Sequence, residues 1–112
     1  MFLAGDAAHI VPPTGAKGLN LAVADIRVLA RGLRDYFESG DERRLDEYSD
    51  RCLQRVWRVQ HFSWWMTSML HQSESTNPFD HRRQVAELEY LVSSRAAMTS
   101  LAESYTGAPF EA

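Results

Sequence analysis

The chain has 112 residues, of which 45% are hydrophobic, 24% charged and 11% aromatic, and its formal net charge is −3 at pH 7. A chain of this size forms one globular domain at most, and its acidic balance argues against nucleic-acid binding, which usually comes with a basic domain. No apolar run approaches the roughly 20 residues of a membrane span, and the single cysteine, Cys52, excludes an internal disulfide and favours a reducing cytoplasm.

The first four residues, Met1 to Ala4, have the apolar pattern of the end of a strand. Three apolar residues cannot form a sheet by themselves. We therefore expect this strand remnant to be frayed unless a second chain pairs with it.

The next stretch, Gly5 to Asn20 (GDAAHIVPPTGAKGLN), leads into a helix. Its two adjacent prolines exclude helical structure, while Gly15 and Gly18 allow a positive φ or a close approach of the backbone to a ligand. The first amides of the following helix lack intrahelical partners and favour an electron-rich ligand. Asp6 is suited instead to accept hydrogen bonds from hydroxyl groups. A plain connection between a strand and a helix has the same composition, so the pattern leaves both interpretations open.

Helical periodicity begins at Leu19, with apolar residues at 19, 22, 26, 29 and 33, and Ser39-Gly40 ends this helix. The remaining chain predicts three more helices, from about Arg43 to about His71, from about Phe79 to Leu91 or Val92, and from about Ser94 to Ser104. Asp41 and Asn77-Pro78 provide their start signals. The predicted fold class is mainly α, a small bundle of about four helices with a short N-terminal strand remnant.

The second of these helices carries more large apolar side chains than one buried stripe requires. Trp57, Trp64 and Trp65 lie off the stripe that runs through Tyr48, Cys52 and Val56. The segment from Phe62 to Met66 therefore packs under another helix or contacts a second protein, since aromatic residues and methionine are enriched at the cores of interfaces.

The titratable residues do not form a self-contained active site. The four histidines share no metal-binding spacing with carboxylates or with Cys52, so we expect no metal site. His9 lies near Asp6 in the sequence and could act as a base, but a structural role is the more usual one for a histidine in such a loop.

The run Gly5-Asp6-Ala7-Ala8-His9, followed by Pro12, Gly15, Gly18 and Asn20, resembles the second flavin-contacting motif of the group A flavoprotein aromatic hydroxylases. The segments HFSWWMTSMLH and ELEYL extend the resemblance over essentially the whole chain. It implies the C-terminal third of an α/β flavoprotein hydroxylase, in which residues 1–18 are a strand end and flavin-contacting loop and residues 19–112 a helical interface region. The N-terminal FAD-binding and substrate domains would lie outside this chain.

The resemblance also implies roles for individual residues. Asp6 would accept a hydrogen bond from the ribityl chain of FAD, and the loop would offer backbone amides to the pyrimidine end of the flavin. Pro13 and Thr14 would lie at the substrate, the Pro13 carbonyl close to its phenol oxygen, and Tyr105 would be the outer tyrosine of a proton relay. The residues expected to contact the cofactor are Asp6, Gly15, Ala16, Lys17, Gly18, Leu19 and Asn20.

The implied reaction is the hydroxylation of 4-hydroxybenzoate, or a close phenolic acid, ortho to the phenol, with FAD as cofactor and NADPH as reductant. The implied assembly is a homodimer, and the chain by itself is expected to be inactive. The alternative from a different class is a non-catalytic helical module for dimerisation or interaction, which a colourless, self-associating chain would favour.

Overall fold

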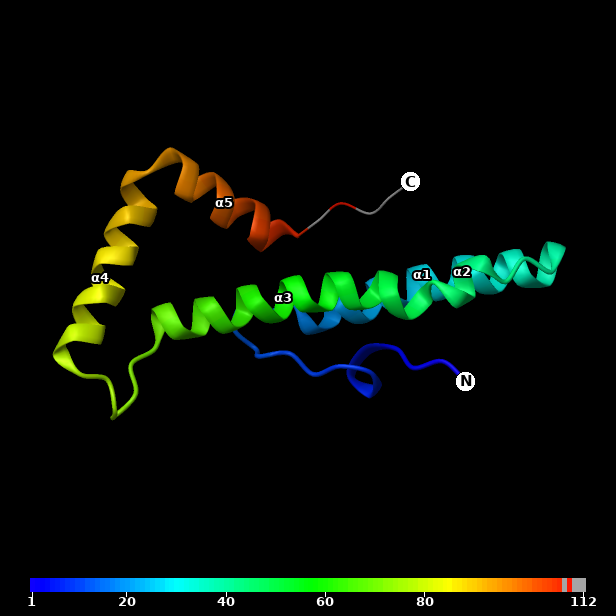
Figure 1. The fold of residues 1–112 in the computed structure, drawn as a ribbon, viewed down its shortest axis with the longest axis horizontal. Helices are drawn as coiled ribbons and strands as arrows, with labels where there is room; N and C mark the ends of the chain where they lie inside the picture. The colour runs from blue at the N-terminus through cyan, green and yellow to red at the C-terminus, as the bar shows by residue number, and fades with distance from the viewer. Residues whose placement is uncertain (108, 110–112) are drawn as a thin grey trace.

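The computed structural model describes residues 1–107 and 109. Within this part of the chain there is a short 3-10 helix, η1 (Gly5–Ala7), followed by five α-helices. These are α1 (Gly18–Ser39), α2 (Arg43–Asp46), α3 (Tyr48–Leu70), α4 (Pro78–Ser93) and α5 (Arg95–Thr106). α1 and α3 form an antiparallel hairpin with α2 in the turn, and α4 and α5 fold back from the far end of α3 (Figure 1). The prediction of a mainly α structure is confirmed.

The predicted strand at Met1 to Ala4 is wrong, because no strand occurs in the described part of the chain. Ala4 has extended dihedrals, φ −143° and ψ 151°, but its segment lies against the helical hairpin rather than against another strand. The Tyr48 hydroxyl donates a hydrogen bond of 2.6 Å to the Leu3 carbonyl, and the Phe2 and Tyr48 rings meet edge to face at 5.7 Å. A side chain of α3 thus satisfies a backbone group that a strand neighbour would otherwise pair.

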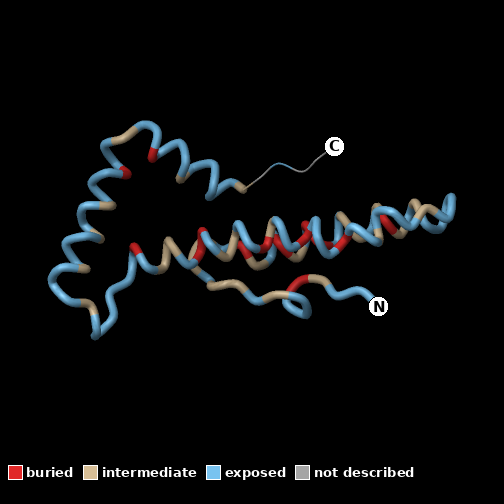
Figure 2. Tube along the Cα trace, in the orientation of Figure 1, coloured by how far each residue is buried: buried red, intermediate tan, exposed pale blue. Residues whose placement is uncertain are grey.

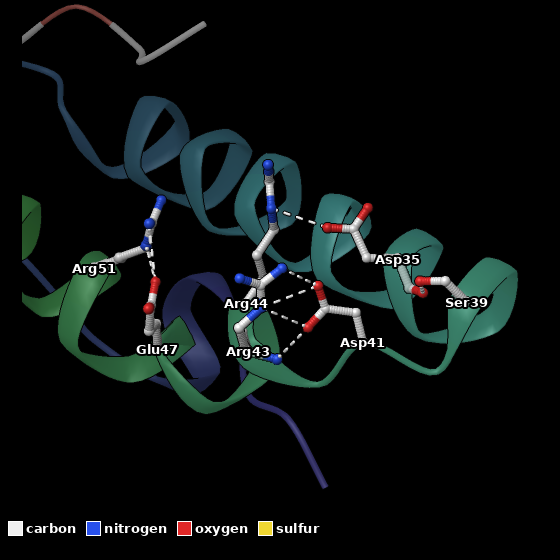
Figure 3. A network of polar contacts seen from close by, with 7 residues as sticks. All are labelled: Asp35, Ser39, Asp41, Arg43, Arg44, Glu47 and Arg51. Carbon is white, nitrogen blue, oxygen red and sulfur yellow. Dashed lines mark hydrogen bonds and ion pairs between the residues drawn. The ribbon is translucent and has the colours of Figure 1, made fainter.

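The long helix predicted from Arg43 to His71 is interrupted at Glu47, which separates α2 from α3. The turn before it is fixed by charged side chains, shown in Figure 3. The N-cap of α2 is Glu42, one residue after the predicted Asp41. Asp41 accepts from the Arg43 backbone amide at 3.0 Å, and the Arg43 guanidinium lowers the pKa of Asp41 to about 2. Arg44 reaches across to Asp35 of α1 at 2.9 Å, which ties α2 to the end of the preceding helix.

The end of α1 and the start of α4 are capped by the residues that the sequence indicated. Gly40 has the left-handed φ of 73° that ends α1. The Asn77 side chain accepts from the Asp80 amide at 2.9 Å, with Pro78 at the first helical position of α4. Ser94 similarly caps α5 by accepting from the Ala97 amide at 3.3 Å.

The described chain is elongated, with extents of 60 × 31 × 17 Å and a radius of gyration of 18.0 Å. A compact domain of this length would have a radius of gyration of about 13 Å. Burial is accordingly concentrated in the seam between α1 and α3, in η1, at the far end of α3 and at the corner between α4 and α5 (Figure 2). The main buried apolar residues are Leu21, Ala24, Tyr48, Cys52, Val56 and Phe62 in the hairpin, and the cluster of Met69 at the end of α3 with Leu91 and Ala97 at the corner.

The buried face of α1 differs from the predicted one. Leu19 and Ile26 are 76% and 59% exposed, whereas Leu21 and Asp25 are each 2% exposed. The helix is apolar on most of its circumference, so periodicity gives the helix but not the side that faces α3. None of the helices in the described part is both long and apolar enough to cross a membrane.

The aromatic segment of α3 divides between the two predicted environments. Phe62 is buried, and the half-buried Trp65 donates its indole N–H to Glu87 of α4 at 2.7 Å. Trp57 and Trp64 are 69% and 63% exposed. The packing interpretation therefore holds for the inner residues of this segment, and the outer tryptophans remain open to a partner.

Candidate functional site

The segment from Gly5 to His9 is fastened to α1 by one carboxylate. Asp25 Oδ2 accepts from the Gly5 amide at 2.9 Å and lies 2.5 Å from His9 Nε2. The Gly5 carbonyl in turn accepts from the Ala8 and His9 amides at 2.9 and 3.0 Å. His9 thus has the structural role that the sequence favoured, and its partner is Asp25 rather than Asp6.

Sequence reasoning missed Asp25. The signal was available, because Asp25 is the only acidic residue between Asp6 and Asp35 and it interrupts the apolar run of the first helix. Its surroundings include Tyr48 and Cys52 of α3. Burial, reinforced by the Asp25 carboxylate, raises the pKa of the Cys52 thiol to about 12, so this cysteine is protonated at neutral pH and is no nucleophile. Cys52 is buried, as its place on the predicted apolar stripe indicated.

The loop from Ile10 to Ala16 lies along α3. Gln60 donates to the Ile10 carbonyl at 3.1 Å, and Thr67 donates to the Thr14 hydroxyl at 2.8 Å. The loop then closes on itself, because the Pro13 carbonyl accepts from the Ala16 amide at 3.0 Å. Side chains of one helix therefore determine the path of the loop.

The two loop glycines serve different purposes. Gly15 has a φ of 95°, and a Cβ there would lie 3.4 Å from the Phe62 ring. Gly18 has no positive φ, and a Cβ built on it meets nothing within 4 Å. Gly15 is thus required by the conformation of the loop, whereas the space beside Gly18 is open to a ligand.

The start of α1 offers backbone donors to that space. Lys17 is the N-cap residue and makes no side-chain capping bond, and the first turn carries no acidic residue. The Leu21 amide bonds back to the Lys17 carbonyl at 3.0 Å, so the amides of residues 18–20 precede the first intrahelical bond. An anionic or electron-rich group suits this end of the helix.

Tyr105, at the end of α5, lies beside the loop although it is remote in sequence. The Lys17 ammonium is 4.5 Å from the centroid of the Tyr105 ring, and Phe62 meets the same ring edge to face at 6.3 Å. Lys17 is only 8% exposed and Tyr105 is 50% exposed. A cation over an aromatic face contributes about 0.5–2 kcal/mol, more when it is desolvated, so this contact joins α5 to the loop.

The structure thus brings together several residues that the resemblance indicated. Gly15 and the Tyr105 ring both lie against Phe62, the Lys17 ammonium lies over the Tyr105 ring, and Thr14 is one position earlier on the loop. The Asp6 side chain is exposed on η1, which packs on α1 through Gly5 and Ala22. Pro13, Ala16, Leu19 and Asn20 are also exposed and accessible to a ligand. Within the described residues, no group of three or more histidine, cysteine or acidic side chains could hold a metal ion.

Comparison with known proteins gives two kinds of match. Residues 1–63 match the family model described as FAD binding domain. The chain is 56% identical over 111 residues to p-hydroxybenzoate hydroxylase of Acinetobacter baylyi, which covers 99% of this chain and 28% of that protein. The chain therefore spans little more than a quarter of the length of this relative.

Two further relatives match shorter parts of the chain. Rifampicin monooxygenase of Streptomyces venezuelae is 72% identical over 25 residues, which is 22% of this chain and 5% of that protein. The mitochondrial ubiquinone biosynthesis monooxygenase of Drosophila melanogaster is 42% identical over 55 residues, or 46% of this chain and 12% of that protein. All three relatives are named as hydroxylases or monooxygenases.

Proposed function

Because this chain belongs to the FAD binding domain family, in the group of flavoprotein hydroxylases, we propose that it supplies part of the flavin and substrate site of an FAD-dependent 4-hydroxybenzoate 3-monooxygenase. The reaction would convert 4-hydroxybenzoate, or a close phenolic acid, to the 3,4-dihydroxy product with NADPH as reductant. Bound FAD would supply the redox chemistry that inserts one oxygen atom of O₂ into the ring. The residues of this chain would bind the flavin, orient the substrate and help to ionise its phenol.

The residues present fit a flavin. The open space beside Gly18 accommodates a ring that approaches the backbone closely, and the uncapped start of α1 favours the negative charge of a reduced flavin. We assign contacts with the pyrimidine end of the flavin to the backbone of residues 15–20. The exposed carboxylate of Asp6 would accept from a ribityl hydroxyl.

The observation that carries the proposal is the contact of Lys17 with Tyr105. It joins a residue of the flavin-contacting loop to the phenol that the resemblance assigns to proton transfer. A half-exposed phenol in this place can pass a proton between solvent and a substrate held near Pro13 and Thr14. The Pro13 carbonyl already accepts from the Ala16 amide and retains a second lone pair for the substrate hydroxyl.

The test uses a chimera, which is p-hydroxybenzoate hydroxylase of Acinetobacter baylyi with its matching segment replaced by this chain. The two segments are 56% identical over 111 residues, so we expect the chimera to fold and to bind FAD. It should oxidise NADPH faster when 4-hydroxybenzoate is added and should form the 3,4-dihydroxy product. The absence of substrate-stimulated NADPH oxidation with any phenolic acid, in a chimera that binds FAD, would contradict the proposed reaction.

In the same chimera, Tyr105→Phe should lower the yield of hydroxylated product per NADPH and raise the yield of hydrogen peroxide. The ring, and with it the contact to Lys17, is kept, while the hydroxyl that would carry the proton is lost. General acid–base groups typically contribute about 10²–10⁴-fold to a rate. Product and peroxide are measured together by chromatography and a peroxidase assay. Equal coupling in the variant and the parent would remove Tyr105 from the reaction.

The second candidate function is self-association, which the outer face of α3 favours. Leu53, Trp57 and Trp64 are 47%, 69% and 63% exposed on this face, and His61 stacks on Trp64 with centroids 6.3 Å apart. We propose that two copies pair through it, since two-fold contacts are the commonest oligomeric arrangement and exposed aromatic clusters mark interaction sites.

Sedimentation equilibrium of the chain tests this proposal. We expect a dimer that Trp57→Ser with Trp64→Ser converts to a monomer. Phe79→Ser, which removes a similarly exposed ring (71%) from α4, serves as the control and should leave the dimer intact. A monomer across a wide concentration range would exclude this face as a contact between copies.

A further inference from the structure

We infer that Asp25 is a positioning residue, which fixes the η1 turn so that the Asp6 carboxylate is presented to FAD. The inference rests on the proposed function, to which it adds a residue beyond the loop that contacts the cofactor. Asp25 itself is 2% exposed on the inner side of α1, so it acts through the segment that it holds.

Two contacts from that segment converge on one atom. The Gly5 amide donates to Asp25 Oδ2 at 2.9 Å, and His9 Nε2 lies 2.5 Å from the same oxygen. Asp6 stands between these two anchors. Its backbone is therefore held on both sides, while its own side chain stays exposed.

Burial of the Asp25 carboxylate costs more free energy than burial of an apolar side chain at the same position. A carboxylate taken out of water is unfavourable unless it is paired and hydrogen-bonded, and an alanine or leucine would close the seam between α1 and α3 without that cost. Asp25 accepts from the Gly5 amide and lies against His9 Nε2, and its charge also contributes to the raised pKa of the neighbouring Cys52 thiol. This geometry indicates that Asp25 holds residues 5–9 against α1.

The conformation of the turn adds to this interpretation. Gly5 has a φ of 63°, and a Cβ there would lie 3.1 Å from the Ala22 side chain. The turn is thus pressed against α1 in a conformation that most residues avoid. A side chain held in its binding position before the ligand arrives loses less entropy on binding, so a fixed turn strengthens the contact between Asp6 and a ribityl hydroxyl.

The first measurement concerns the turn itself and needs no cofactor. In the chain, Asp25→Asn should speed hydrogen exchange of the Gly5 amide by about tenfold or more, because a charge-assisted hydrogen bond is lost. Asp35→Asn is the matched control, since Asp35 lies on the same helix but pairs with Arg44. It should leave the Gly5 exchange rate unchanged. An unchanged rate in a helical Asp25→Asn variant would overturn the inference.

The second measurement is a double-mutant cycle for FAD binding in the chimera. Asp25→Asn and Asp6→Ala should each raise the dissociation constant of FAD about tenfold or more. If Asp25 acts through Asp6, then Asp25→Asn should have little further effect in the Asp6→Ala background. In Asp25→Asn, the KM for 4-hydroxybenzoate at saturating FAD should stay unchanged. Fully additive effects, or an unchanged dissociation constant in Asp25→Asn, would overturn the positioning role.

Two controls keep the outcomes separate. If Asp25→Asn loses its helical circular dichroism, His9→Ala takes its place, since it keeps the carboxylate and removes one of the two contacts with it. An unchanged dissociation constant in His9→Ala would then overturn the inference. If the unmutated chimera binds no FAD, the proposed function fails, and the exchange rate of the Gly5 amide still decides whether Asp25 holds the turn.

Discussion

The two loop glycines provide a test that separates the needs of the fold from the needs of a ligand. We consider Gly15→Ala and Gly18→Ala, which add the same methyl group three positions apart. Gly15 has a left-handed φ of 95°, and an added Cβ would contact the Phe62 ring at 3.4 Å. Gly18 opens α1 with an ordinary φ and with nothing within 4 Å of an added Cβ.

The expected effects on stability follow from these geometries. A side chain at a left-handed position costs roughly 1–2 kcal/mol, so Gly15→Ala should lower the free energy of unfolding by about that amount. At Gly18 the strain is absent, and the exchange of glycine for alanine in a helix favours folding by no more than about 1 kcal/mol. Gly18→Ala should therefore leave the chain equally stable or slightly more stable. Urea denaturation followed by circular dichroism measures both values.

Gly18→Ala should weaken FAD binding, although it should not destabilise the chain. In the chimera, Gly18→Ala should raise the dissociation constant of FAD about tenfold or more, because its methyl group enters the space that we assign to the ring and keeps the ligand from the amides of residues 18–20. Titration of the apo-protein by flavin fluorescence gives the constant. Unchanged affinity in Gly18→Ala would refute the assignment of that space to the flavin, whatever the result for Gly15→Ala.

Two other predictions concern the helical hairpin. Gly32→Ala would place a Cβ 2.7 Å from Leu45 Cδ2, 3.3 Å from its Cγ and 3.4 Å from its backbone nitrogen. The overpacking should cost about 1–3 kcal/mol and so exceed the gain in helix stability of about 1 kcal/mol. Urea denaturation should show a net loss of stability that Leu45→Ala relieves in the double variant. The pKa of Cys52 is raised from 9.0 to about 12 and that of Tyr48 from 10.0 to about 12, in both cases mainly by burial. Because both groups give up their protons more readily in the unfolded chain, the stability that they contribute is complete below about pH 9 and is lost progressively up to about pH 12. Unfolding midpoints measured over this range should fall, less steeply in Cys52→Ala, and a parallel decline in that variant would exclude the thiol as a cause.

The sequence predicted the helices well because their signals are local. Gly40, Asn77 and Pro78 each act on the backbone of their own turn, so neighbouring residues suffice to place a helix end. The break at Glu47 was missed, since nothing in its composition resembles a stop signal. The strand at Met1 to Ala4 was a wrong prediction because a strand depends on a neighbour that the described chain does not provide.

Local sequence patterns did not predict the contacts between residues that are remote in the sequence. The face of α1 that packs on α3 is chosen by Leu21 and Asp25, although Leu19 and Ile26 fit the helical period equally well. Asp25 was overlooked because its partners lie on a different element. The family resemblance supplied a role for Tyr105 but not its position over Lys17, which depends on the path of α4 and α5.

The site depends on α3 more than on any other element. Three hydrogen bonds join α3 to the N-terminal segment, in the same order along the helix and along the segment: Tyr48 to Leu3, Gln60 to Ile10, and Thr67 to Thr14. From Tyr48 to Thr67 the helix rises about 28 Å at 1.5 Å per residue.

The N-terminal segment has little length to spare between the same anchors. Leu3 to Thr14 can extend to at most about 36–40 Å, and η1 takes up part of that length. The stiff Pro12-Pro13 pair suits such an extended course, because each ring holds the backbone out of helical conformations. The three bonds therefore align the turn that carries Asp6 and the loop at the start of α1 along the same helix, which is how two short motifs can act on one ligand.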